Sequence, residues 1–482
     1  MDIKSNFAAH VTPHFRVLSD DQIYEIHLAT LEVLERTGVQ IPEEEAVDLL
    51  SGAGARVSDG GQVRIPSYLV EDALRSAPER ITLANRDGER RVFLEGNKVY
   101  FGTGSDCPYL LDSYTGERRP FQKEDVEKAA RLCDHLPNID FIMSLGLVSD
   151  APTATSDRHQ FEAMLVNTKK PIVFTAHDVK GMSDIIEMAA IAMGGREELR
   201  RSPCIVLYAE PISPLRHFGA AVRKLLLAAE EEIPAIYTPC PMCGATAPST
   251  LAGTLVTANA ECLSGLVISQ LKRKGAPFIT GGFISIMDMR EAILSYGAPE
   301  LSLLSAALTE IAHFYRLPMF GTAGCSDAKV LDEQAAVESA ISCLMSALSG
   351  AHLVHDVGFL EYALTGSYEM VVLTDEIIGM VKRIMGGIDV SRETLAVDVI
   401  DRVGPGGNFL VEAHTLKHFR QEQWFPDLVD RRTYENWTKA GAKTMGQRAK
   451  EKVKKILDEH RPEPLPPDRR RAIAEIVARG DP

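Results

Sequence analysis

Short apolar segments of strand length recur eight times along the chain, and segments with helical periodicity separate most of them. The apolar segments are residues 98–102, 141–145, 172–175, 204–208, 235–238, 278–280, 319–321 and 352–355. Regular alternation of strand and helix is typical of βα units. Eight such units predict an α/β fold of the (β/α)8 TIM-barrel type, although an open parallel sheet would also alternate in this way.

The segments on either side of this repeat have a different pattern. Before it, helical patterns cover residues 20–37, 43–50 and 66–76, and residues 81–94 alternate like an exposed hairpin that turns at Arg86-Asp87-Gly88. After it, helices are expected at 367–385, 393–403, 434–459 and 469–479. We therefore predict an N-terminal α+β cap (1–97), a barrel (98–362) and a helical C-terminal extension (363–482).

Charge and composition exclude several classes of protein. The net charge of −15 argues against a nucleic-acid-binding protein and against docking on anionic lipid. The N-terminus lacks the basic and apolar regions of a secretory signal, and no apolar run has the length of a membrane helix, so we expect a cytoplasmic protein. The eight scattered cysteines are expected to be free thiols.

The familiar short motifs do not fit this sequence. Cys240-Pro-Met-Cys243 has no second Cys/His pair nearby at metal-ligand spacing, so no metal site is predicted. The glycines at 102–104 and 321–324 match neither a dinucleotide fingerprint nor a P-loop. No Gly-x-Ser-x-Gly elbow follows a strand, which argues against a Ser-His-Asp hydrolase.

Polar and aromatic residues gather where the predicted strands end, and in a barrel these ends share one rim. The turn at 317–329 carries Asp327 and Lys329. Other polar residues at this rim are Asp106, His177, Asp178, Glu210, Cys240, His355, Asp356 and Glu361. Aromatic residues at or near the rim are Tyr100, Phe101, Tyr109, Tyr208, Tyr237, Phe283 and Phe320. They would either fill the core or form a cage for a quaternary ammonium, which ring faces attract.

Several segments resemble one family in the same order along residues 20–450. They include Asp112-Ser-Tyr-Thr-Gly116, residues 244–253, Gly297-Ala-Pro-Glu300, Asp327-Ala-Lys329, Asp375-Glu-Ile-Ile378 and Gly406-Gly-Asn-Phe-Leu410 with His414-Thr415. In these segments the chain resembles the trimethylamine methyltransferase superfamily. The resemblance implies a TIM barrel that moves a methyl group from a methylated amine to the Co(I) of a partner corrinoid protein, with no tightly bound cofactor of its own.

The resemblance also bears on the substrate. Trimethylamine enzymes carry a pyrrolysine, which nothing in this sequence marks. The chain is therefore more similar to the glycine betaine:corrinoid methyltransferases, which would give dimethylglycine, and relatives act on proline betaine, carnitine or γ-butyrobetaine. A quaternary ammonium leaves as a neutral amine, so the protein needs to bind the cation, orient it and exclude water.

On this basis we assign candidate roles from rim position. Asp327, His355 and Glu361 are the candidate catalytic residues. The candidate substrate-binding residues are Tyr100, Phe101, His177, Tyr208, Glu210, Tyr237, Phe283, Phe320, Lys329 and His414. Lys329, His177, His355 or His414 would supply a donor to a substrate carboxylate.

The expected partners are a cognate corrinoid protein, a small quaternary amine and further copies of this chain, held by the helical extension. Three alternatives stay open. The first is another betaine, or a methyl acceptor other than a corrinoid protein. The second is a non-catalytic barrel that binds a quaternary amine as a sensor. The third is a lyase or aldolase in which Lys329 forms a Schiff base.

Overall fold

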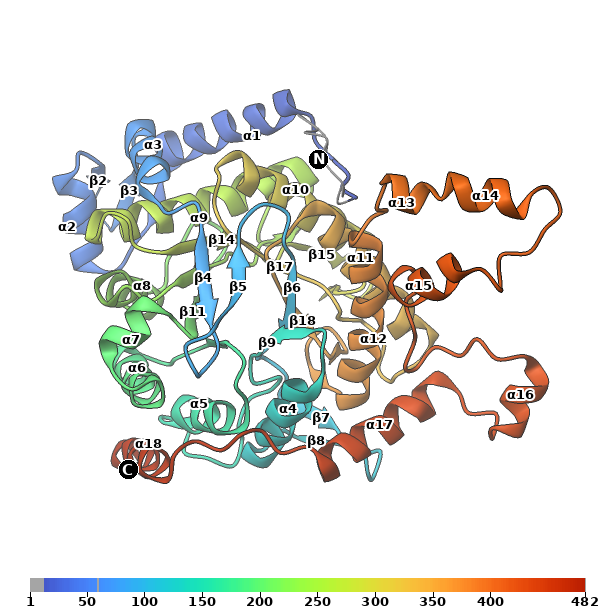
Figure 1. Ribbon diagram of the computed structural model, residues 1–482. Coiled ribbons are helices and arrows are strands. Elements are labelled where there is room, and N and C mark those ends of the chain that lie inside the picture. The colour runs from blue at the N-terminus through green and yellow to red at the C-terminus, as the bar shows by residue number, and fades with distance from the viewer. Residues whose placement is uncertain (1–12, 59, 482) are drawn as a thin grey trace.

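Eight parallel strands form a closed barrel in the computed structural model, which describes residues 13–58 and 60–481 (Figure 1). In spatial order they are β10 (Ile172–Phe174), β11 (Ile205–Ala209), β12 (Ala235–Tyr237), β14 (Phe278–Gly281), β17 (Met319–Thr322), β18 (Leu353–Val357), β6 (Tyr100–Thr103) and β9 (Ile139–Phe141). The ring closes where the amide of Val173 donates to the carbonyl oxygen of Ile142 at 2.9 Å. The predicted TIM barrel and all eight of its strands are confirmed.

Alternate residues of each strand face opposite sides of the barrel wall, as strand geometry requires. Val173, Val206, Ile236, Ile279 and Leu353 fill the interior, and their neighbours along each strand pack beneath the helices. The parallel strands are apolar on both faces for this reason.

Helices follow the strands and form the outer layer. They are α4 (Lys123–His135), α5 (Ser156–Asn167), α6 (Val179–Met193), α7 (Arg196–Arg201), α8 (Gly219–Glu231), α9 (Leu251–Lys272), α10 (Pro299–Phe314), α11 (Glu333–Ser349) and α12 (Tyr368–Met385). The helix α12 packs against α11 on one side and α4 on the other, which is the place of the last barrel helix. We had assigned this helix to the C-terminal extension, so that assignment is corrected.

A hairpin closes the N-terminal end of the barrel. Strands β4 (Ile81–Ala84) and β5 (Arg90–Leu94) pair antiparallel, as predicted, and Figure 1 shows them crossing in front of the barrel. The expectation that this hairpin is exposed was wrong. Its apolar side chains Ile81, Leu83, Val92 and Leu94 are buried in the same cluster as the barrel interior. They seal that end because the interior side chains would otherwise face water.

The predicted N-terminal helices pack on one side of the barrel. They are α1 (Asp20–Glu32), which ends in a π-helical turn (Val33–Thr37), α2 (Glu44–Gly52) and α3 (Ser67–Ser76), and all three contact α9. By length and composition alone α9 could cross a membrane, but 78% of its apolar window is buried inside the protein. Its apolar character is explained by these contacts.

The C-terminal extension divides into two parts. The helices α17 (Met445–Glu459) and α18 (Pro467–Gly480) return to the barrel, where α17 packs on α12 and α18 on α6. Between α12 and α17 the chain forms an arm, residues 388–425, which Figure 1 shows projecting away from the barrel. The arm contains α13 (Arg392–Leu395), α14 (Val397–Val403) and α15 (Ala413–Glu422), and the short helix α16 (Tyr434–Lys439) follows it.

One of the predicted C-terminal helices is broken. Residues 393–403 form α13 and α14 because Ala396, with φ of 52°, interrupts the helix. Residues 434–459, where more than one helix was predicted, form α16 and α17, with Gly441 at φ of 98° between them.

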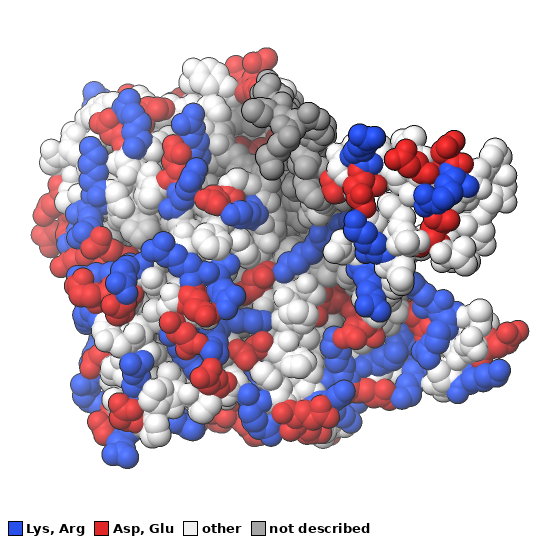
Figure 2. All heavy atoms as spheres, viewed as in Figure 1, with Lys and Arg blue, Asp and Glu red and all other residues white. Residues whose placement is uncertain are grey.

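Figure 2 shows the face of the molecule that carries the hairpin. Lysine and arginine alternate with aspartate and glutamate across it, and neither sign gathers into a large area. This face therefore offers no strong electrostatic attraction to a charged macromolecule.

Candidate active site

A cluster of polar side chains lies at the open end of the barrel, and its first members lie at the C-terminal end of β11. The hydroxyl of Tyr208 donates to Oε2 of Glu210 at 3.2 Å, and the thiol of Cys240 donates to the same oxygen at 3.2 Å. Tyr208 points inward because it has the same parity as the interior residue Val206. Glu210 and Cys240 follow the ends of adjacent strands, so the barrel brings them together.

A bulge in β18 turns two consecutive polar residues toward the interior. The pairing of β18 with β6 shifts between Val354 and Val357, and Asp356 takes a left-handed backbone conformation with φ of 77°. Bulges and backbone strain of this kind concentrate at functional sites. The Oδ1 atom of Asp356 consequently lies 3.3 Å from Nε2 of His355.

The His355–Asp356 pair fits an uncharged state. Nδ1 of His355 lies 2.8 Å from the carbonyl oxygen of Gly321, to which it donates, so Nε2 is left as an acceptor. Burial lowers the pKa of His355 to about 4. Burial, reinforced by Asp106, raises the pKa of Asp356 well above its usual range. Burial thus disfavours the charged form of both groups.

Aromatic rings surround these groups. Phe320, on β17, lies with its ring centroid 4.3 Å from that of His355 and 5.7 Å from that of Tyr208. On another side Phe283 stacks on Tyr296 with centroids 4.4 Å apart, and Tyr296 meets the edge of Phe359 at 6.4 Å. Gly104 completes the wall, because a Cβ there would collide with Asp356 and Phe359.

Three carboxyl groups give the site its electrostatic character. Burial raises the pKa of Asp106, of Glu210 and of Asp356, and the charge of Asp106 raises the latter two further. Asp106 and Glu210 nevertheless keep accessible surface, so solvent reaches both residues. Carboxyl groups outnumber basic groups at this site, and a bound cation would favour ionisation of the carboxyl groups.

The basic side chain that acts on Glu210 is Lys224, from α8. Its ammonium group donates to the carbonyl oxygen of Ala176, and burial lowers its pKa. Its charge lowers the pKa of Glu210, but less than burial raises it. Lys224 thus offsets the acidity of the site only in part.

Asp327 positions part of the aromatic wall. Its carboxylate accepts hydrogen bonds from the hydroxyl of Ser295 at 2.5 Å and from the amide of Tyr296 at 2.7 Å. It therefore fixes the loop between β14 and α10 that carries Tyr296. Both oxygens are engaged by the protein, so Asp327 has a positioning contact here, and its catalytic role stays a prediction.

Comparison with known proteins now identifies the family. A family model described as "Trimethylamine methyltransferase (MTTB)" matches residues 2–481. The chain belongs to the trimethylamine methyltransferase family. It is 38% identical to the trimethylamine methyltransferase MttB of Desulfitobacterium hafniense DCB-2, over 95% of this chain and 92% of that one. It is 33% identical to the glycine betaine methyltransferase of D. hafniense Y51, over 95% of each chain.

A solved structure, the Methanosarcina barkeri monomethylamine methyltransferase MtmB, is also similar, with a TM-score of 0.48, 12% identity and coverage of 94% of this chain and 96% of that one. Since the relatives are named methyltransferases, this member of the trimethylamine methyltransferase family is an enzyme of that class.

The trimethylamine methyltransferase fold places five of the predicted site residues in or beside the cluster. Tyr208, Glu210, Phe320 and His355 face the interior, and Phe283 joins them through Tyr296. Their roles in binding or catalysis stay predictions.

Three predicted aromatic residues do not reach the cluster. Tyr237 and Phe101 face outward from their strands, and the hydroxyl of Tyr237 lies 2.6 Å from Nδ1 of His217 beneath α9. Tyr100 faces inward but lies at the sealed end, where its hydroxyl accepts from the amide of Phe93 at 3.2 Å.

The remaining predicted residues lie at the rim or beyond it. Glu361 pairs with Arg118 at 2.9 Å and accepts from Thr365. Lys329 is exposed and donates to the carbonyl oxygen of Asp327, and the exposed His177 lies 2.9 Å from the hydroxyl of Ser156. His414 belongs to the arm. The structure therefore places these residues outside the cluster, and the roles assigned to them stay predictions.

Tyr296 and Phe359 are wall residues that sequence reasoning missed. Tyr296 lies on a loop and Phe359 in the short strand β19 (Phe359–Leu360), both beyond the ends of the barrel strands. Periodicity carries no signal for which residues of such connections fold inward. Asp106, Cys240 and Asp356 were recognised as rim positions but received no role, and their proximity to one another becomes evident only in three dimensions.

Proposed function

We propose that this enzyme transfers a methyl group from a quaternary amine, with glycine betaine as the first candidate, to the Co(I) of a corrinoid carried by a partner protein. The observation that carries the proposal is a set of three carboxyl groups with raised pKa, Asp106, Glu210 and Asp356, beside the ring faces of Tyr208 and Phe320. Ring faces and carboxylates attract an alkylammonium cation and disfavour an anion.

Each group has a defined task in the proposed reaction. Ring faces hold the ammonium and exclude water, and Glu210, fixed by Tyr208 and Cys240, orients the cation. A protonated carboxyl group donates to a substrate carboxylate, because Lys329 and His177 have other partners and His414 belongs to the arm. The largely neutral surroundings suit a reaction in which the substrate loses its charge, because permanent carboxylates would stabilise the ground state.

The corrinoid supplies the nucleophile that accepts the methyl group. This chain's own contribution is an open end of the barrel at which the amine lies. The relatives named after trimethylamine and glycine betaine support this class of reaction. We further propose that the protein is cytoplasmic.

Methyl transfer to Co(I) cobalamin, free or bound to the cognate corrinoid protein, tests the proposal. A panel of glycine betaine, proline betaine, carnitine, γ-butyrobetaine and trimethylamine is offered, and methylcobalamin is followed by its absorbance. We expect transfer from glycine betaine, with dimethylglycine as the product. Transfer from trimethylamine alone would overturn the choice of a quaternary amine, and no transfer from any amine would overturn the reaction.

We also propose that the protein assembles into a homo-oligomer through its arm. In the arm Ile388, Leu410, Val411 and Leu416 are 77%, 80%, 90% and 75% exposed, which is unusual for apolar side chains of this size gathered in one segment. A second copy of the chain would cover them.

A further inference from the structure

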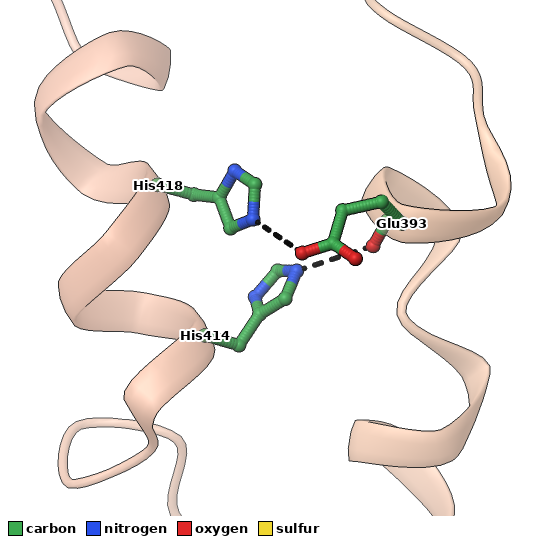
Figure 3. A group of neighbouring side chains, drawn as sticks. All are labelled: Glu393, His414 and His418. Carbon is green, nitrogen blue, oxygen red and sulfur yellow. Dashed lines mark hydrogen bonds and ion pairs between the residues drawn. The ribbon is translucent and has the colours of Figure 1, made fainter.

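Three potential metal ligands meet on the arm, far from the barrel's open end. Figure 3 shows His414 and His418 projecting from one side of α15 toward Glu393 of α13. One ligand atom from each of the three residues lies within 4.8 Å of the others. This arrangement was not anticipated, since His414 was expected to bind substrate and no metal site was predicted.

The two histidines lie four residues apart, so one helix face presents both. Their ring centroids are 4.3 Å apart. Nε2 of His418 lies 3.2 Å from Oε1 of Glu393, and Nε2 of His414 lies 3.3 Å from the carbonyl oxygen of the same residue. Both imidazoles therefore already direct Nε2 at Glu393, one at its carboxylate and one at its backbone carbonyl. Imidazole nitrogen and carboxylate oxygen are ligands that zinc accepts.

The arm lacks the apolar core that normally holds helices together. None of the residues of α13, α14 or α15 is buried. What joins α13 and α14 to α15 is polar: the contacts of Glu393, and an ion pair of 2.6 Å between Arg402 and Glu412. A segment without enough core is commonly stabilised by a metal or another cross-link.

We propose that Glu393, His414 and His418 bind a structural Zn²⁺ ion that fastens α13 to α15. A tetrahedral zinc needs donor atoms about 3.4 Å apart at bond lengths of 2.0–2.1 Å, so small side-chain rotations bring the three donors into place. Water or a residue of a second copy would fill the fourth position.

Lys417 competes with the ion for Glu393. Its ammonium lies 2.6 Å from Oε1, the same oxygen that faces His418. Zinc binding requires this exposed lysine to turn away toward solvent. Replacing Lys417 by methionine should therefore strengthen binding, which is a result that a merely structural cluster would not give.

The test is zinc binding by the full-length protein, measured by competition with a chromophoric chelator after metal removal. We expect one Zn²⁺ per chain, a loss of affinity of at least about 10-fold in H414A, H418A and E393Q, and a gain in K417M. The substitution R420A on the same helix serves as the matched control and should bind like the wild type. Cobalt(II) in place of zinc should give the visible absorption of a tetrahedral site in the wild type and lose it in H418A.

Two outcomes would overturn the proposal. One is wild-type affinity in the triple variant of Glu393, His414 and His418, which would place any zinc elsewhere, for example at the cysteines. The other is no zinc bound by the wild-type protein or by K417M. Neither measurement involves methyl transfer, so failure here is distinguishable from failure of the proposed reaction.

Discussion

Glu210 lies at the open end of the barrel, is exposed to solvent and is held by hydrogen bonds from two neighbouring side chains. The substitution E210Q keeps its shape and removes its negative charge. A quaternary ammonium has no N–H to donate, so its interaction with Glu210 is coulombic and is worth roughly 1–4 kcal/mol at about 4 Å between bulk water and a protein surface. We therefore expect KM for the amine to rise at least about 5-fold. Steady-state methyl transfer measures this, and E197Q, on the exposed surface of α7, is the control. Unchanged KM in E210Q would remove Glu210 from substrate binding.

Phe320 and Phe101 form a matched pair for testing the aromatic wall. Both are buried phenylalanines of barrel strands, but Phe320 faces the interior and Phe101 faces the helices. F320L should weaken binding of a quaternary ammonium about 3- to 30-fold, since a ring face contributes roughly 0.5–2 kcal/mol. F101L should lower the unfolding free energy and leave the affinity unchanged. Calorimetric titration with glycine betaine separates the two, and equal affinity losses would argue against a cage.

The difference between these two residues also shows where sequence reasoning ends. Strand positions could be read from apolar runs, and all eight were. The direction of each side chain could not, because barrel strands are apolar on both faces and alternation is lost. Ile236 and Tyr237 illustrate this, since the smaller residue faces inward and the tyrosine faces outward. Asp327 was placed correctly at the rim, but its bonds to Ser295 and Tyr296 depend on a loop fold that the sequence does not reveal.

At the scale of secondary-structure elements, His217 connects β12, α8 and α9. It precedes α8, and its ring lies 2.6 Å from the hydroxyl of Tyr237 and 2.9 Å from that of Ser264. Burial lowers its pKa to about 4. In the unfolded chain an ordinary histidine has a pKa near 6.5, so between pH 6.5 and 4 the unfolded state binds the extra proton. Stability is therefore lost as the pH falls through this range.

We predict that the unfolding free energy of H217Q falls less steeply with decreasing pH than that of the wild type, by about 1.4 kcal/mol per pH unit below pH 6.5. Urea unfolding at pH 7, 6 and 5 measures it as the difference from wild type. The comparison with the wild type is required because burial raises the pKa of Glu261 to about 7, and this shift makes the unfolding free energy rise as the pH falls. Both proteins contain Glu261, so its contribution cancels in the difference. The control Y237F removes a contact of His217 without removing a titrating imidazole, so its cost should be similar at each pH. Equal slopes in H217Q and wild type would contradict the prediction.

The predicted boundaries of helices were wrong where a single residue changes the backbone conformation. Residues 393–403 have a continuous helical pattern, yet Ala396 divides them, and nothing in an alanine announces a left-handed conformation. In contrast, the barrel helices are long and packed on both neighbours, so their periodicity was enough to find them. The pairing of the hairpin at 81–94 was predicted correctly, but its burial was not, because alternation of apolar and polar residues does not specify what covers the apolar face.

At the scale of the whole molecule, the arm predicts the assembly state. The double substitution L410D/V411D places two charges on the most exposed apolar residues of the arm, and we expect a smaller assembly at micromolar concentration. Light scattering after size-exclusion chromatography gives the mass. The control Q421D adds a charge at an exposed polar position of α15 and should leave the mass unchanged. A wild-type mass in the double variant would exclude these residues from the interface.

The hairpin that seals the N-terminal end has a consequence for the order of events in catalysis. Leu83 and Leu94 close that end, so the described part of the chain leaves the barrel open only at its C-terminal end. The amine and the proposed corrinoid partner must use the same opening. The amine therefore has to enter before the partner protein docks, and the demethylated product can leave only after the partner protein dissociates. High concentrations of the partner protein should therefore inhibit turnover by trapping product, and a barrel open at both ends would show no such inhibition.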